Sequence, residues 1–233
     1  MLKVEEFVEA LKKVDLAADA FNPWREYDIL YDSSSAAPIV RSIQLTAYLQ
    51  ERIGQAEYIL LAEGLSYQGG KFTGIAMTSE RIILGNHDVV PAEAVFNIKP
   101  HRTSNMGISS SVDRLGMAEP TASIVWKALL KNKIPPRKVV LWNIFPWHPF
   151  KGRDFLTNRT PNEIELNLGF RYFERLLGLF PNCQVLCLGK KSEATLKQAM
   201  PELEVTALRH PANGGAKLFE AGLVDFLRTH RSI

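Results

Sequence analysis

Short apolar runs recur along this chain, and each is ended by turn residues or by a polar side chain. Four of these runs predict buried strands, at residues 58–62, 139–142, 183–188 and 203–208. The segments between them carry apolar residues at helical spacing and predict helices, at residues 4–18, 38–53, 121–131, 161–179, 192–200 and 216–231. Strands that alternate with helices indicate an α/β fold, and we expect a three-layer α/β/α sandwich around a central, mainly parallel four-stranded sheet.

The connections between these elements are predicted to be loops. Residues 64–74 are rich in glycine, which permits close approach of a ligand to the backbone. Residues 85–118 are polar and lack periodicity, so we expect an irregular excursion over the surface. Thr160, followed by Pro161 and Glu163, predicts the start of a helix with Thr160 as its N-cap.

The composition is that of an ordinary globular protein, with 46% hydrophobic and 23% charged residues among 233. No linker rich in Pro and Gly divides the chain, so we expect one domain over residues 1–233, with an N-terminal helical part at 1–54 and an α/β core at 55–233. No apolar stretch approaches the ~20 residues that span a bilayer, and the N-terminus lacks a secretory signal, which favours a cytoplasmic location. The net charge of +3 permits nucleic-acid binding without requiring it.

The two cysteines indicate neither a disulfide nor a metal site. Cys183 and Cys187 lie on one predicted strand at an even spacing, so their side chains share a face but stand too far apart to bridge. A pair of cysteines is also too few for a four-cysteine metal or iron–sulfur site. We expect two buried, unreactive thiols.

Polar residues of three chemical kinds, Glu63, Asn143 and His210, follow three of the apolar runs. Ligands of open α/β sheets bind beyond the carboxyl ends of the strands, so we expect these side chains to share one site. Taken singly, each has an ordinary structural alternative: a cap for Glu63, an Asx turn for Asn143 and a structural histidine for His210. Their joint occurrence favours the shared site.

The segments around these residues resemble the motifs of the uracil-DNA glycosylase superfamily, in that family's chain order. Residues 62–66 (Ala-Glu-Gly-Leu-Ser) are similar to the Gly-Glu-Ala-Pro-Gly motif of its iron–sulfur branch, and residues 70–74 (Gly-Lys-Phe-Thr-Gly) resemble the Phe-containing segment that follows it. Residues 142–143 (Trp-Asn) and 158–161 (Asn-Arg-Thr-Pro) look like the branch's strand-end Asn and its Asn-Arg-Thr/Asp-Pro helix start. Residues 209–212 (Arg-His-Pro-Ala) resemble the final His-Pro-Ser motif.

The resemblance implies an enzyme that hydrolyses the N-glycosidic bond of uracil in DNA during base-excision repair. In this assignment Glu63 orients or deprotonates the attacking water, and His210 donates a hydrogen bond to uracil O2 as negative charge develops on the base. Asn143 reads the uracil edge with its donor and acceptor, and Phe72 stacks on the flipped base. The cysteines that bind the cluster in the iron–sulfur branch are missing, so we expect no cluster, no metal and no other cofactor.

The chain departs from the family pattern at two places. The best-studied members of that family have Asp at the third position of the first motif, where this chain has Gly64. Glu63, at the second position, is therefore the carboxylate expected to act on the water. Gly64 and the nearby Tyr67 are expected to line the substrate site. Gly214 stands where relatives insert a wedge side chain into the duplex, which predicts a preference for single-stranded or mismatched DNA unless Leu218 or another loop serves as the wedge.

DNA is expected to be held mainly through its phosphates, by basic and polar groups near the strand ends and by N–H groups at the start of the last helix. The candidates are the side chains of Arg159, Lys190, Lys191, Arg209, Asn213 and Lys217 and the backbone N–H groups of Gly214 and Gly215. We expect a monomer that binds uracil-containing DNA and no membrane, and we expect a structural role for His148.

Three other functions fit the same residues. The protein could be a glycosylase for another deaminated base, such as hypoxanthine or xanthine. It could be a non-catalytic nucleic-acid-binding member of the fold. It could also be an unrelated α/β protein that binds a phosphorylated ligand on the Gly69–Gly70 loop, although that loop lacks the P-loop and dinucleotide-binding spacings.

Overall fold

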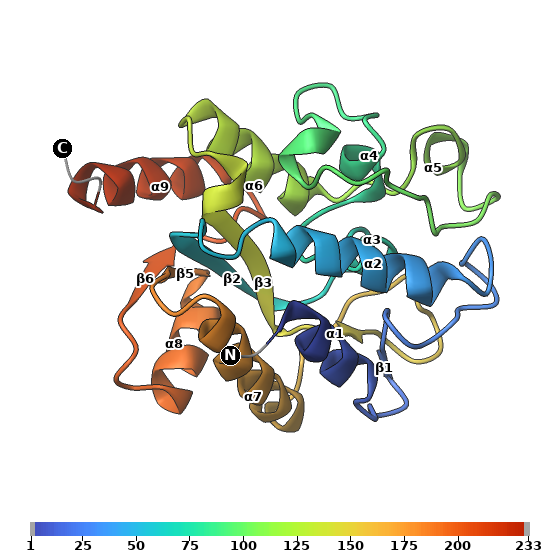
Figure 1. Cartoon of the computed structure of the whole chain (residues 1–233), viewed down its shortest axis with the longest axis horizontal. Coiled ribbons are helices and arrows are strands. Elements are labelled where there is room, and N and C mark those ends of the chain that lie inside the picture. The colour runs from blue at the N-terminus through green and yellow to red at the C-terminus, as the bar shows by residue number, and fades with distance from the viewer. Residues whose placement is uncertain (1–2, 231–233) are drawn as a thin grey trace.

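A parallel four-stranded sheet forms the centre of the computed structural model, which describes residues 3–230 (Figure 1). Its strands are β2 (Tyr58–Gly64), β3 (Val139–Phe145), β5 (Gln184–Leu188) and β6 (Val205–Leu208). They lie in the order β3-β2-β5-β6, and every neighbouring pair is parallel. The predicted α/β fold with a four-stranded parallel sheet is confirmed.

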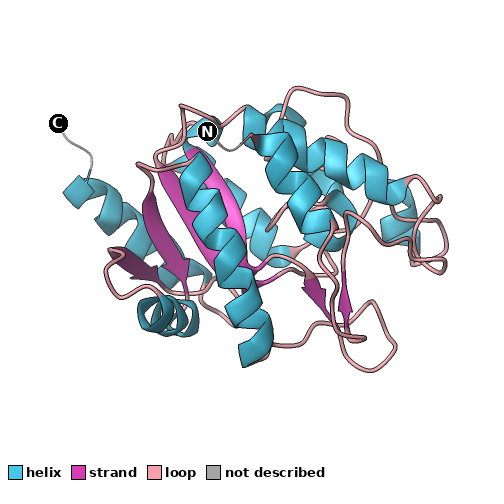
Figure 2. Cartoon of the chain, turned by 60° about the horizontal axis from the view of Figure 1, so that its bottom comes forward, coloured by secondary structure: helices cyan, strands magenta, loops and turns pink. Residues whose placement is uncertain are grey.

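Helices cover both faces of this sheet. They are α1 (Val4–Lys12), α2 (Ala37–Gln50), α6 (Pro120–Lys131), α7 (Glu163–Leu179), α8 (Lys190–Ala199) and α9 (Ala216–His230). α7 and α8 lie on one side of the sheet, whereas α6 and α9 lie on the other (Figures 1 and 2). Residue 231, the predicted end of the last helix, lies outside the described residues. No helix within residues 3–230 combines the length and apolar character needed to cross a membrane.

Several short elements were not predicted. They are the antiparallel pair β1 (Ala20–Phe21) and β4 (His148–Pro149), the helices α3 (Gly70–Thr73) and α5 (Ser110–Leu115), and the 3₁₀ turns η1 (Ala92–Ala94) and η2 (Pro136–Lys138). Residues 78–84 predict the start of a short helix, and α4 (Glu80–Ile83) lies there. α3 interrupts the predicted glycine-rich loop, and η1 and α5 lie in the predicted irregular segment.

Several helix ends differ from the prediction. α2 ends at Gln50 rather than near residue 53, and α8 begins at Lys190 rather than residue 192. At two other ends the hydrogen bonds supply the reason. α1 ends at Lys12 rather than near residue 18, since side-chain N–H groups of Asn22 and Trp147 donate to its Leu11 carbonyl at 2.9 and 3.3 Å. The predicted N-cap at Thr160 is wrong. Asn162 caps α7 instead, accepting from the Glu165 N–H at 3.0 Å while the Glu165 carboxylate accepts from the Asn162 N–H at 2.8 Å. The capping box lies two residues later than predicted because the Glu165 side chain, not that of Glu163, accepts from the backbone N–H of the N-cap residue.

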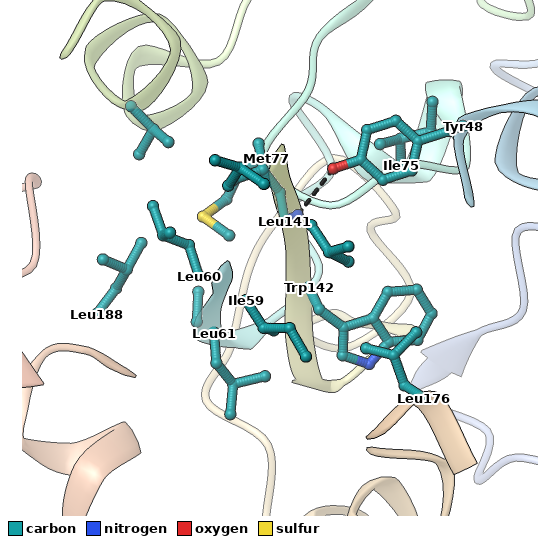
Figure 3. Close-up of a cluster of buried hydrophobic side chains, with 14 of the residues drawn as sticks. Tyr48, Ile59, Leu60, Leu61, Ile75, Met77, Leu141, Trp142, Leu176 and Leu188 are labelled. Atoms are coloured by element: carbon teal, nitrogen blue, oxygen red, sulfur yellow. Dashed lines mark hydrogen bonds between the residues drawn. The ribbon is translucent and has the colours of Figure 1, made fainter. Parts of the chain in front are cut away.

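The free edge of β3 is covered by α2 and the turn after it. The Leu141 N–H donates to the Tyr48 hydroxyl at 2.7 Å (Figure 3), and the Arg52 guanidinium donates to the Val139 carbonyl, also at 2.7 Å. The Trp142 side chain, also on β3, points toward Leu176 of α7 (Figure 3). The edge strand therefore presents few unpaired backbone groups to solvent.

The cysteines are free thiols. Cys187 is buried, while Cys183 is half-buried rather than fully buried and donates to the Ala56 carbonyl at 3.2 Å. Burial raises the pKa of Cys183 to about 11 and that of Cys187 to about 12. Both thiols are protonated at neutral pH and hence weak nucleophiles.

Candidate functional site

A cavity of about 890 Å³ opens at the carboxyl ends of the sheet strands. Glu63 reaches it from β2, Asn143 from β3 and His210 from the segment after β6. β2 and β3 are in parallel register with Ala62 opposite Asn143, which places the amide beside the strand end that carries Glu63. The three polar residues at the strand ends therefore share one cavity.

Not every residue expected at the site reaches the cavity. Its wall includes Glu63, Gly64, Asn143, Arg159, Lys190, Arg209, His210 and Asn213, and it does not include Tyr67, Phe72, Gly214 or Lys217. Tyr67 is half-buried outside the wall, and its backbone N–H donates to Asn158 Oδ1 at 3.0 Å. Gly214 and Lys217 are exposed where the chain enters α9.

The Asn143 amide is held in one orientation. Its side chain is 2% exposed, and Nδ2 donates to the Gly64 carbonyl at 3.0 Å. That carbonyl can only accept, so Oδ1 must be the atom that faces away from it. Oδ1 is buried without a hydrogen-bond partner. Asn143 thus offers one unused acceptor and retains one of its two Nδ2 hydrogens.

His210 is held in a defined tautomer. Its Nδ1 accepts the Ala212 backbone N–H at 3.1 Å, so the proton of the neutral ring lies on Nε2. Burial, together with the positive charge of Arg209, lowers the pKa of His210, against an opposing effect of Glu63. The half-buried ring is therefore neutral near pH 7 and presents Nε2–H as a donor.

Glu63 forms an ion pair across the cavity. Its carboxylate lies 2.6 Å from Lys191 Nζ at the start of α8. The Glu63 side chain is 23% exposed, and that of Lys191 is 59% exposed. The Oε1 atom that faces Lys191 is buried, so the exposed part of the Glu63 side chain lies elsewhere on it.

Gly64 is closely packed at the end of β2. A Cβ at this position would lie 3.0 Å from Pro161 Cγ and 3.4 Å from Pro149 Cγ, so a side chain here would require the Pro161 ring to move by a few tenths of an ångström. Glu63 is the carboxylate that this strand end supplies.

The expectation that Phe72 faces the base does not hold in this structure. Its side chain is fully buried, and Lys71 Nζ lies 4.0 Å from the centre of its ring. Lys71 is itself buried and pairs with Asp28 at 2.8 Å. The aromatic ring is thus occupied by a buried cation behind the glycine-rich segment.

Met77 and Glu119 line the cavity and were missed by the sequence analysis. Met77 has a φ of +47°, a left-handed conformation that is uncommon for a residue with a side chain. Its apolar side chain forms part of the cavity wall, which Phe72 does not reach. Glu119 precedes α6. Nothing in local sequence signals either residue, because the fold brings both to the strand ends.

The basic residues divide into structural and accessible groups. The Arg159 guanidinium contacts the Glu165 carboxylate at 2.6 Å and the Asp19 carboxylate at 3.0 Å, and its remaining donors reach backbone carbonyls. Arg159 therefore clamps its own loop and has no donor left for a phosphate, contrary to the expectation. Lys190 and Arg209 are exposed at the cavity, as is Lys151, which the sequence analysis did not select.

At the turn before α9, the Gly215 N–H was expected to be available to a phosphate, but it is already used within the chain. Gly215 N–H donates to the Ala212 carbonyl at 3.1 Å. A Cβ at Gly215 would lie 2.0 Å from the His210 carbonyl oxygen, so the chain folds tightly back on itself here. Asn213 and Gly214 both have positive φ, which shapes this turn around His210.

His148 has the structural role expected of it. Its ring nitrogens lie 3.1 Å from the Leu65 carbonyl and 3.0 Å from the Phe155 carbonyl, and burial lowers its pKa to about 4. The ring joins the loop after β2 to the loop after β4. Within residues 3–230, no group of three or more His, Cys, Asp or Glu side chains is arranged to hold a metal ion.

Comparison with known proteins finds similarity in structure rather than in sequence. The sequence matches no known protein family and no curated protein. The structure is similar to the crystal structure of wild-type SMUG2 from Pedobacter heparinus, with a TM-score of 0.62 over 98% of each chain and 13% sequence identity. At this identity, the likeness shows that the two chains share a fold.

Proposed function

We propose that this protein is a DNA glycosylase that removes uracil by hydrolysing its N-glycosidic bond. The observation that carries the proposal is the pairing, in one cavity, of an unpartnered Asn143 Oδ1 with a neutral His210 that presents Nε2–H. The motif resemblance and the fold shared with SMUG2, a glycosylase of the uracil-DNA glycosylase superfamily, support it.

The side chains can be assigned to the two ends of the base. Asn143 Oδ1 accepts uracil N3–H, and the remaining Nδ2 hydrogen donates to O4. Cytosine has a ring nitrogen acceptor and an amino group at these positions, so it would leave buried groups unpaired. His210 Nε2–H donates to O2. Met77, rather than Phe72, supplies the apolar surface against the base.

Bond cleavage develops charge that these groups can stabilise. The water oxygen bonds to C1′ of the sugar as the C1′–N1 bond breaks, and the electron pair of that bond leaves with the base. His210 stabilises the resulting negative charge. Glu63 accepts a proton from the water and its negative charge favours the cationic sugar. Lys191, now paired with Glu63, is exposed enough to bind a phosphate.

DNA is the proposed macromolecular partner. Lys151, Lys190 and Arg209 supply positive charge at the cavity rim. Gly214 has no side chain to insert into a duplex, which favours single-stranded or mismatched DNA, although Leu218 is 63% exposed on the first turn of α9 and could act as a wedge. We expect the enzyme to act as a monomer in the cytoplasm.

Hypoxanthine and xanthine are the second candidate substrates. Both carry the same neighbouring N–H and C=O groups as uracil on a larger ring. A cavity of about 890 Å³ has room for a bicyclic base.

Excision from labelled oligonucleotides tests the proposal. The substrates carry uracil in a single strand, opposite A and opposite G, with hypoxanthine and xanthine in parallel. We expect His210→Ala to lower the single-turnover rate about 100-fold to 1,000-fold, as loss of a preorganised donor does. Asn143→Ala should lower it comparably with DNA binding largely retained. His101→Ala, which changes an exposed histidine outside the cavity, is the control.

Two results would count against the proposal. If wild type releases no base from any of these substrates, the protein is not such a glycosylase. If excision occurs but neither His210→Ala nor Asn143→Ala slows it, the chemistry lies elsewhere on the molecule.

A further inference from the structure

Glu119 differs from every other buried carboxylate within residues 3–230. The buried acids are Asp28, Asp32, Glu80, Glu119 and Glu165. Four of them are paired with a cation or accept several N–H groups. Glu119 Oε2 is buried without any hydrogen-bond partner. A buried polar group without a partner is costly to folding, so its retention calls for a reason.

The position of Glu119 supplies a reason, because this residue lines the cavity. It lies beside Pro120 and Thr121, which also line the cavity, and its side chain is 6% exposed. The carboxyl group lies against Gly69, where a Cβ would approach Oε2 to 1.9 Å. The carboxyl occupies the space that a side chain at residue 69 would fill, so Glu119 packs directly against the glycine-rich segment.

The carboxyl group is neutral over much of the physiological range. Burial raises the pKa of Glu119 to about 8, and no neighbouring charge contributes to the shift. The charged groups that face the cavity are Glu63, Lys151, Arg159, Lys190, Lys191 and Arg209, with the titratable His210. A neutral carboxyl group carries one O–H donor and keeps an acceptor oxygen.

We propose that Glu119 is a specificity-determining residue that donates a hydrogen bond to a carbonyl oxygen of the base bound in this cavity. The inference rests on the proposed glycosylase function and narrows its substrate class. Asn143 Oδ1 requires an N–H donor, and the Glu119 O–H requires an acceptor. Uracil, hypoxanthine and xanthine carry both an N–H and a C=O group.

The unmodified bases cytosine and adenine fit this arrangement poorly. Each presents an amino group where its deaminated product has a carbonyl oxygen. An amino group cannot accept the Glu119 O–H, so this donor would lack the acceptor that a carbonyl oxygen supplies. Glu119 would therefore favour bases with adjacent N–H and C=O groups, such as uracil and hypoxanthine, over cytosine and adenine.

The test compares wild type with Glu119→Gln and Glu119→Ala in single-turnover excision of uracil from a single strand, between about pH 6 and pH 9.5. Glu119→Gln keeps a donor and cannot ionise, whereas Glu119→Ala removes the donor. Glu174→Gln, which changes an exposed residue of α7, is the matched control. Thermal unfolding of each variant establishes that it is folded.

We expect wild-type excision to decline above about pH 8, where Glu119 ionises. Glu119→Gln should remain within a few-fold of wild type at neutral pH and lack this alkaline decline, and Glu119→Ala should be slower by about 10-fold to 100-fold. If both variants match wild type at every pH, the inference is overturned.

A second measurement separates this inference from the glycosylase proposal. If wild type excises no base, the glycosylase proposal fails. The role of Glu119 is then tested by the shift in the thermal unfolding midpoint that free uracil, hypoxanthine or xanthine causes. Stabilisation of wild type and Glu119→Gln that is lost in Glu119→Ala supports the role of Glu119 in binding the base. Equal stabilisation of wild type, Glu119→Gln and Glu119→Ala, or stabilisation of none of these proteins, overturns the proposed role of Glu119.

Discussion

Single residues decide which chemistry this cavity can support. A side chain at residue 64 would press against Pro161, so the proposed water-activating role is assigned to Glu63, the carboxylate present at this strand end. The Ala212 N–H fixes the tautomer of His210, and the Gly64 carbonyl fixes the orientation of Asn143. In each case a backbone group determines which side-chain atom remains available to a ligand.

The ionisation of Glu119 predicts a pH dependence of stability. The carboxyl has an ordinary pKa of 4.5 in the unfolded chain, and a pKa of about 8 in the folded protein. As pH rises between these values, the unfolded state releases a proton that the folded state keeps, so the free energy of unfolding falls. Glu119→Gln should be more stable than wild type by on the order of a few kcal/mol near pH 8, with the difference fading toward pH 4.5. Urea unfolding at several pH values measures this difference, and one that does not change with pH would contradict the assignment.

At the scale of elements, the long segment at residues 85–118 is held by side chains rather than by regular structure. Glu80 of α4 accepts the backbone N–H groups of Thr103, Ser104 and Met117 at 2.8, 2.9 and 3.2 Å, and the Ser104 hydroxyl at 2.5 Å. One buried carboxylate thus anchors two distant points of this irregular segment, in addition to the isolated antiparallel bridge between Ser104 and Asp32.

Glu80→Gln is expected to loosen this segment. The amide keeps a single oxygen and places an NH₂ group against N–H donors, so at least one buried donor loses its partner. We expect a loss of about 2–4 kcal/mol in the free energy of unfolding. Urea unfolding measures the loss, with Glu93→Gln on η1 as the control, and amide exchange should accelerate at Thr103 and Ser104. Unchanged exchange at these two residues would show that the carboxylate is not the anchor.

At the scale of the whole molecule, a buried ion pair joins the N-terminal residues to the segment behind the cavity, because Lys71 of α3 pairs with Asp28 at 2.8 Å. A second buried pair, Arg41 of α2 with Asp32 at 2.7 Å, lies within the N-terminal residues. The Gln44 amide of α2 also donates to the Thr73 carbonyl at 3.0 Å. The contacts link the predicted N-terminal helical part to the glycine-rich segment of the predicted core.

Removal of one partner should therefore destabilise the molecule as a unit. Lys71→Met leaves Asp28 buried without its cation, and we expect a loss of about 3–5 kcal/mol in the free energy of unfolding. The double variant Lys71→Met with Asp28→Asn should recover part of that loss, because no unpaired charge remains. Urea unfolding followed by fluorescence and by circular dichroism measures both. Two separate transitions in wild type would contradict the expected single domain.

The sequence alone determined the strands, the main helices and the strand ends at which Glu63, Asn143 and His210 lie. Apolar runs and helical periodicity are local properties, and the rule that ligands bind at the carboxyl ends of parallel strands turns them into a predicted site. Helix ends were predicted less well, since the end of α1 depends on side chains from Asn22 and Trp147, which lie elsewhere in the chain.

Only the tertiary structure decided which side chains face the cavity. Phe72 lies in a glycine-rich motif, but its ring packs against buried Lys71. Arg159 was expected to contact phosphates, but its N–H groups donate to Glu165 and to carbonyl groups of its own loop. Glu119 reaches the cavity from the start of a distant helix. Burial, hydrogen-bond satisfaction and pKa depend on neighbours that are remote in sequence, and those neighbours are set by packing rather than by any local pattern.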